Sequence, residues 1–276
     1  MEFVAMFIWL SLCLLIGAMM HSLLHSSFSY KFLLWIAAPG VIIRKFAIAV
    51  TAMLTGATVD RANIYHISER EVAFTGEGFA TVSKFMVPIA PLFICALVLQ
   101  GANAALGSPL SLDLEAPEIS SFDAGGFHVF IKGLGFLIVS LVRNVFQAEW
   151  GNFRLYVLFL LLFSLSLGAG VPLDKVRNSL IGIIILVLVL TLLCTLFKVP
   201  SGPVNPFGPP RKSAFAIKRL RDFLMETSAM ALIMMLCGML TSVMTGIGVR
   251  IFEIIKENTG ALETPPPEAE AEHEKE

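Results

Sequence analysis

Residues 33–57, LLWIAAPGVIIRKFAIAVTAMLTGA, form an apolar run that carries two adjacent cations, Arg44 and Lys45, near its middle. The hydrocarbon core of a bilayer is about 30 Å thick and takes about 20 helical residues to cross, so this run is long enough to span a membrane. A cation near the centre of a span costs about 3 kcal/mol on insertion scales. We therefore expect Arg44 and Lys45 to face a partner, a cavity or a functional site instead of lipid.

The composition of the whole chain is that of an integral membrane protein. Of its 276 residues, 56% are hydrophobic and only 15% are charged, and its mean hydropathy of +0.80 exceeds that of ordinary soluble domains. The formal net charge of −1 indicates no nucleic-acid partner. The four cysteines lie in apolar runs, where a free thiol behaves as a small hydrophobe, and the sequence contains no CxxC pair.

The distribution of apolar runs predicts an all-α fold, a polytopic bundle of about six transmembrane helices. The runs are 3–20, 33–56, 84–106, 154–171, 178–198 and 224–252. A seventh segment, 129–147, has doubtful depth, because its uncharged interval between Lys132 and Arg143 is only ten residues long. It either spans the bilayer or lies in the interface as an amphipathic helix. Gly133-Leu-Gly135 and Gly246-Ile-Gly248 indicate close packing of helices.

Two local features interrupt this pattern. Residues 58–81 carry charges among β-branched and aromatic residues, so we expect a small polar excursion that forms a short hairpin. Pro88 and Pro91 lie near the start of the span 84–106 and should bend it. A membrane helix tolerates such a bend where its neighbours satisfy the freed carbonyls.

The charges between the spans predict the orientation of the chain. The stretch 107–127 contains four acidic residues and no Lys or Arg, whereas 199–222 is basic and rich in proline. By the positive-inside rule the connector 199–222 is cytoplasmic, and its cations either contact anionic lipid or an acidic partner, or act as a solvated topology signal. These cations are Arg211, Lys212, Lys218, Arg219 and Arg221. Residues 1–257 form one membrane domain, and the acidic, proline-rich tail 258–276 should be disordered.

A set of short motifs resembles the membrane-embedded metallopeptidases of the site-2 protease type. In that family the second helix opens with Ala-Pro-Gly, continues after three residues into His-Glu-x-x-His, and ends in a Gly-Ala pair. Here Ala38-Pro39-Gly40 and Gly56-Ala57 occupy the first and last of these places, and Pro88 and Pro91 match the third helix. The similarity covers residues 30–197, the protease-like core. It includes Asp174 in Pro172-Leu-Asp174, where the family carries an aspartate as its third zinc ligand.

The metal motif itself is replaced. In the active enzymes two histidines four residues apart bind zinc, and the glutamate after the first polarises a water. The resemblance places Arg44, Lys45 and Ile48 at these three positions. Arginine has no lone pair to offer a metal, lysine is a poor replacement for a carboxylate base, and isoleucine has no donor atom. The resemblance therefore implies a protease fold with no catalytic residue and no metal cofactor.

A buried ion pair could replace the metal. Loss of zinc would leave the Asp174 carboxylate without its counter-ion, and we hypothesise that Arg44 pairs with Asp174, while Lys45 finds another partner or water. A guanidinium–carboxylate separation beyond about 6 Å with no bridging water would defeat this pairing. The alternative is that Arg44 and Lys45 lie at a helix break or in a wet cavity, and that Asp174 caps the following helix.

A second candidate metal site is formed by His21 and His25, which are four residues apart in His21-Ser-Leu-Leu-His25. With His66 or Asp174 they could complete a zinc site. The missing glutamate and the position at a helix end weaken this hypothesis. Interfacial histidines that reach for headgroups are commoner.

These observations favour a non-catalytic membrane subunit or scaffold of a larger complex, with the bilayer and other membrane protein subunits as its partners. Short loops and the absence of disulfides fit the cytoplasmic (inner) membrane of a bacterium. Two alternatives stay open at this point. One is an active zinc intramembrane protease with displaced ligands. The other is a small-solute or ion transporter, suggested by intramembrane charges and proline-broken helices.

Overall fold

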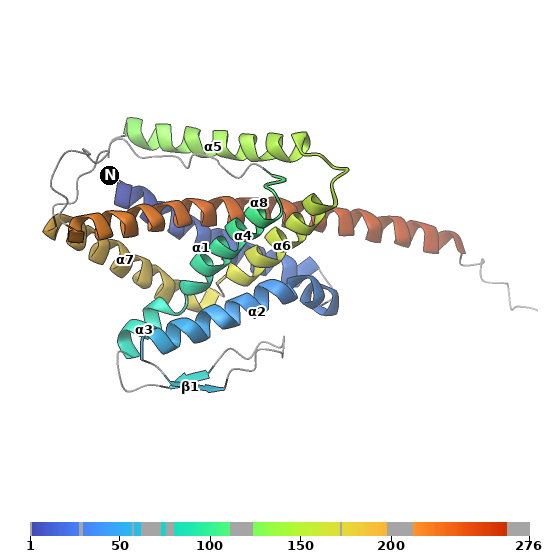
Figure 1. Cartoon of the computed structure of the whole chain (residues 1–276). Coiled ribbons are helices and arrows are strands. Elements are labelled where there is room, and N and C mark those ends of the chain that lie inside the picture. Colours follow the sequence, from blue (N-terminus) through green and yellow to red (C-terminus); the bar gives the residue numbers. More distant parts are fainter. Residues whose placement is uncertain are drawn as a thin grey trace, which may run out of the picture.

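The computed structural model describes residues 2–27, 30–56, 58–61, 73–75, 80–110, 124–171, 173–197 and 212–263. These residues form a helical bundle with one pair of short strands, which confirms the predicted fold class (Figure 1). Five of the described helices, α1, α2, α5, α7 and α8, are long and apolar enough to cross a membrane. The elements are α1 Glu2–Ser27, α2 Tyr30–Leu54, β1 Thr58–Arg61, β2 Ala73–Thr75, α3 Ala80–Met86, α4 Ala90–Ala105, α5 Ala124–Gln147, α6 Phe153–Ala169, α7 Leu173–Leu196 and α8 Lys212–Glu263.

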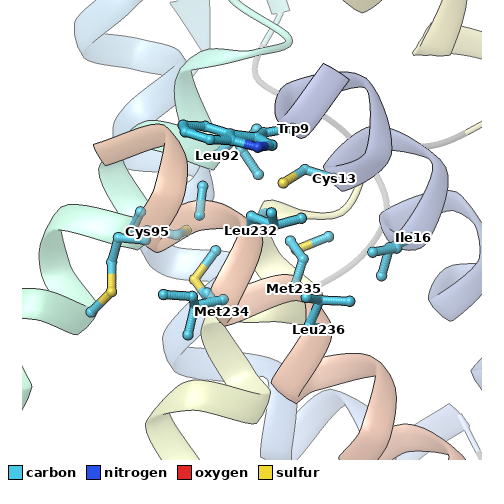
Figure 2. Close-up of a cluster of buried hydrophobic side chains, with 14 of the residues drawn as sticks. Trp9, Cys13, Ile16, Leu92, Cys95, Leu232, Met234, Met235 and Leu236 are labelled. Carbon is cyan, nitrogen blue, oxygen red and sulfur yellow. The ribbon is translucent and has the colours of Figure 1, made fainter. Parts of the chain in front are cut away.

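The core of the bundle is built where α1, α4, α6 and α8 meet. Helix α1 packs along α8 and α7, and α6 lies against α2, α4 and α8. Figure 2 shows side chains of α1 facing those of α8, with two residues of α4 beside them. The labelled residues are Trp9, Cys13 and Ile16 of α1, Leu92 and Cys95 of α4, and Leu232, Met234, Met235 and Leu236 of α8.

Small residues let α2 and α6 approach closely. A Cβ added at Gly40 would overlap the backbone of Ser164, and one added at Gly168 would overlap the backbone of Gly40. The Gly40 N–H also donates to Ser164 Oγ at 2.8 Å. Because lipid tails are as apolar as side chains, helices in a bilayer associate through such close packing and interhelical hydrogen bonds. The glycine that follows Pro39 thus fixes where α2 crosses α6.

Proline divides the predicted span 84–106 into two helices. Pro88 lies in the turn between α3 and α4, and Pro91 lies in the first turn of α4, where its missing N–H would have no intrahelical partner. Val87 and Ile89, on either side of Pro88 in this turn, are both buried. The predicted bend is confirmed, and it takes the form of a break.

The predicted hairpin is also confirmed. Strand β1 pairs antiparallel with β2, with Thr58 opposite Thr75 and Val59 opposite Phe74. The intervening residues 62–72 lie outside the described part of the chain.

Helix α8 is longer at both ends than the sequence analysis expected. It runs unbroken from Lys212 to Glu263, so residues 212–222 are not connector and 258–263 are not part of a disordered tail. The physical reason is that no proline occurs between Pro210 and Pro265, while the charged residues at both ends are good helix formers. The remainder of the predicted connector, 199–211, and of the tail, 264–276, lies outside the described residues.

Helix α5 is the segment of doubtful depth. It begins at Ala124 instead of residue 129, and its 24 residues make it about 36 Å long, enough to cross a bilayer. Phe130, Leu137 and Leu141 form its buried face, and Lys132 and Arg143 are exposed. The helix lies along one side of the bundle (Figure 1). The helix is therefore long and apolar enough to span a membrane, although its uncharged interval is only ten residues long.

Candidate functional site at the turn between α6 and α7

Arg44 and Lys45 lie in the interior of α2, which is helical without a break from Tyr30 to Leu54. The alternative that they mark a helix break is therefore wrong. Successive residues on a helix point about 100° apart, and the two cations have different surroundings. Arg44 is half-buried, whereas Lys45 is buried, with only 6% of its surface exposed. Ile48, at the position of the second histidine in the resemblance, is buried.

The Arg44 guanidinium binds the end of α6. Its Nη1 donates to the carbonyl oxygen of Gly170 at 2.8 Å. Gly170 is the residue at which α6 ends, and its own N–H donates to the carbonyls of Ser166 and Leu167. The last carbonyls of a helix lack intrahelical donors and carry partial negative charge, so a cation there is favourable. This contact explains how a half-buried guanidinium is accommodated in an apolar bundle.

The same contact places Arg44 beside the turn that leads to Asp174. Gly170 and Val171 form the described part of this turn, and α7 begins at Leu173 instead of residue 178. Asp174 is thus in the first turn of α7, where a carboxylate is favoured by the helix dipole. Its side chain lies outside the described part of the structure. The Arg44–Asp174 ion pair accordingly stays a prediction.

A third cation joins this junction from α7. Lys175 is half-buried and close enough to Arg44 for the two like charges to interact. Cys95 of α4 is fully buried and also lies within electrostatic reach of Arg44. Neither Lys175 nor the Gly170 carbonyl was predicted from the sequence as part of a site. The one available signal was that both stand next to the Pro172-Leu-Asp174 motif.

The described side chains offer no ready-made metal site. No three His, Cys, Asp or Glu side chains come together among those that the structure places. The histidines at 21 and 25 belong to the last turns of α1. Their side chains, His66 and the Asp174 carboxylate lie outside the described part of the chain. The displaced-ligand site therefore stays a prediction as well.

The basic residues of the predicted connector differ in their exposure. Arg221 is buried and forms an ion pair with its neighbour Asp222 at 2.8 Å. Arg219 is exposed and Lys218 is half-buried. Arg211 and the side chain of Lys212 lie outside the described residues. Of the three described side chains, Arg221 is thus the least accessible to a lipid headgroup.

Comparison with known proteins adds no relative: no family model, no curated protein and no solved structure matches this chain. The resemblance to the site-2 protease type consequently depends on the motifs themselves. It stays a prediction. What the structure shows is that helix α2 places Arg44 against the turn after α6, through its hydrogen bond to the Gly170 carbonyl.

Proposed function

We propose that this protein is a non-catalytic subunit or scaffold of a larger membrane complex, with a fold derived from an intramembrane metallopeptidase. The hydrogen bond from Arg44 to the Gly170 carbonyl carries this proposal. A guanidinium stays protonated in proteins and has no lone pair for a metal. Zinc at the same place would also be repelled by Arg44 and by the adjacent ammonium of Lys45.

In this proposal the guanidinium takes over one task of the metal, which is to join two parts of the chain that are far apart in sequence. Arg44 and Gly170 are 126 residues apart, and their bond links α2 to the junction of α6 and α7. The link preserves the arrangement of the helices without the hydrolytic chemistry. A helical bundle held together in this way can bind a transmembrane helix of a partner subunit on its outer surface.

In this proposal the protein lies in the cytoplasmic membrane of a bacterium, with the start of α8 on the cytoplasmic side. The positive-inside rule supports this orientation, because Lys218 and Arg219 lie near that end. Of the described cations in the predicted connector, Arg219 is the exposed one and is therefore available for contact with anionic headgroups.

Restoring the metal motif tests the derivation of the fold. We expect the triple variant Arg44→His, Lys45→Glu, Ile48→His to bind one zinc per chain, and to lose it when Asp174→Asn is added. The matched control is Ile42→His with Phe46→His. It has the same four-residue spacing on the exposed face of α2 and should not hold zinc stoichiometrically. Metal content is measured by elemental analysis of the purified protein.

The outcomes separate the two parts of the proposal. A triple variant that keeps the helicity and melting temperature of the natural chain but binds no zinc would contradict the metallopeptidase origin. Stoichiometric zinc in the natural chain, lost in His21→Ala with His25→Ala and required for peptide-bond cleavage, would contradict the non-catalytic role. Purification at native expression with a reversible crosslinker should recover the partner subunits, and a chain recovered alone would contradict the complex.

A further inference from the structure

Helix α8 is too long for the bilayer it crosses. Its uncharged interval, 227–249, is bounded by Glu226 and Arg250 and is about 35 Å long, which matches a hydrocarbon core of about 30 Å. The helix nevertheless continues to Glu263. Its C-terminal end projects beyond the rest of the bundle, with no other described element beside it (Figure 1). The part from Arg250 onward therefore lies outside the hydrocarbon.

The projecting end carries an apolar stripe. Met244, Ile247, Ile251 and Ile254 are 71%, 52%, 52% and 56% exposed. They follow one another at intervals of three and four residues, the spacing that places residues on one helix face and that defines the seam of a coiled coil. The same spacing upstream reaches Cys237 and Ile233, both buried in the bundle. The stripe thus continues the core-facing side of α8 beyond the point where the other helices of the bundle cover it.

One further observation shows that this surface is suited to another helix. Ile251 and Ile254 follow Arg250, beyond the hydrocarbon, where exposed isoleucines gain from burial against a partner. Lipid tails cover Met244 and Ile247 in a monomer but do not reach the second half of the stripe.

We infer that residues 244–261 of α8 pair with the same segment of a second copy of this chain as a parallel coiled coil. All copies insert into the membrane with one orientation, so two α8 helices are parallel and in register from the start. The sequence places Asn258 and Ala261 at the next two positions of the seam. Asparagine at a core position favours an identical partner, because an amide both donates and accepts and is its own complement.

A cysteine scan of the full-length chain in its native membrane tests this pairing. Single cysteines are introduced at 247, 251 and 254 on the seam, and at 249 and 253 on the opposite side of the helix, and are treated with a bismaleimide. The unsubstituted chain is the baseline, because its four cysteines are buried. We expect a product of twice the chain mass, with a several-fold higher yield at the seam positions. Equal yields along the segment, or no such product, would overturn the inference.

A substitution pair gives an independent measurement. Ile251→Ser with Ile254→Ser should lower the dimer association constant at least about tenfold, since two buried isoleucines are lost from each copy. Val249→Ser, a single apolar-to-serine change on the opposite side of the helix, should leave it unchanged. Light scattering of the detergent-solubilised protein measures both. A dimer unaffected by the double substitution would overturn the inference. In the cysteine scan, crosslinks from positions 251 and 254 to a different protein would also overturn it, as would protection of these positions by lipid without any crosslink. None of these outcomes affects the zinc test, which concerns only α2 and Asp174.

Discussion

The junction of α2 with α6 and the projecting end of α8 differ in how closely they are packed and in which side chains they expose. At the junction, backbones touch without side chains between them, the Arg44 guanidinium donates to the Gly170 carbonyl, and the Ser164 hydroxyl oxygen accepts from the Gly40 N–H. At the end of α8, apolar side chains face outward and the glycines have open space. Polar groups thus bind one another at the junction, whereas the described surface at the end of α8 is apolar and exposed. A partner helix is therefore expected at the second region and not at the first.

The largest effect should come from filling the closest approach. Gly40→Ala should destabilise the bundle by about 3 kcal/mol or more, because the new methyl would overlap the Ser164 backbone and force α2 away from α6. The matched control is Gly101→Ala in α4, where the space is open and the better helix propensity of alanine should add up to about 1 kcal/mol. Unfolding followed by circular dichroism in detergent compares the two. Equal stabilities would show that α2 and α6 are not locked at Gly40.

Removing the guanidinium should have the next largest effect. Arg44→Met leaves the Gly170 carbonyl without this donor, and we expect a loss of about 1–3 kcal/mol in unfolding free energy. Arg44→Lys keeps the charge but not the planar fork, so its loss should be intermediate. Arg143→Met, which removes an exposed cation from α5, should change the stability by less than about 0.5 kcal/mol. A natural-like stability of Arg44→Met would mean that the guanidinium does not join α2 to the α6–α7 turn.

A smaller loss is expected from the single hydrogen bond at the crossing. Ser164→Ala removes the acceptor of the Gly40 N–H and should cost about 0.6–1.5 kcal/mol, the range of side-chain hydrogen bonds between membrane helices. Thr195→Ala is the control, because its exposed hydroxyl bonds only to carbonyls of its own helix. If both variants lose the same amount, the interhelical bond is not what stabilises the crossing.

The elements that sequence reasoning predicted are those set by local chemistry. Pro88 lies in the turn between α3 and α4 and Pro91 starts α4, as the lack of a backbone N–H in proline favours, and the β-branched residues near 58 and 75 favour strands. The full length of α8 was not predicted because the polar ends of a helix and a polar connector have the same composition. Close packing was predicted at Gly135, Gly246 and Gly248, where the chain leaves open space, and is found instead at Gly40 and Gly168. Which glycine meets a neighbour depends on how helices cross.

The candidate site shows the same division between local and long-range information. The sequence indicated that Arg44 and Lys45 need an internal environment, because a cation in lipid is unfavourable wherever it occurs. It named Asp174 as the partner of Arg44 through the resemblance. The described partner is a backbone carbonyl, Gly170, and every residue has a carbonyl, so side-chain identity carries no signal for such a contact. Only the arrangement of α2 and α6 reveals it.

The smallest effect on stability is expected from substitutions at the projecting end of α8. Ile251→Ser with Ile254→Ser changes side chains that are more than half exposed in the single chain, so at high dilution the bundle should unfold within about 0.5 kcal/mol of the natural chain. Raising the protein concentration should stabilise the natural chain but not this variant, because only a chain that self-associates gains stability by mass action. Melting temperatures measured over a wide concentration range test this. A variant destabilised equally at every concentration would show that the stripe belongs to the fold of one chain and not to contact between two.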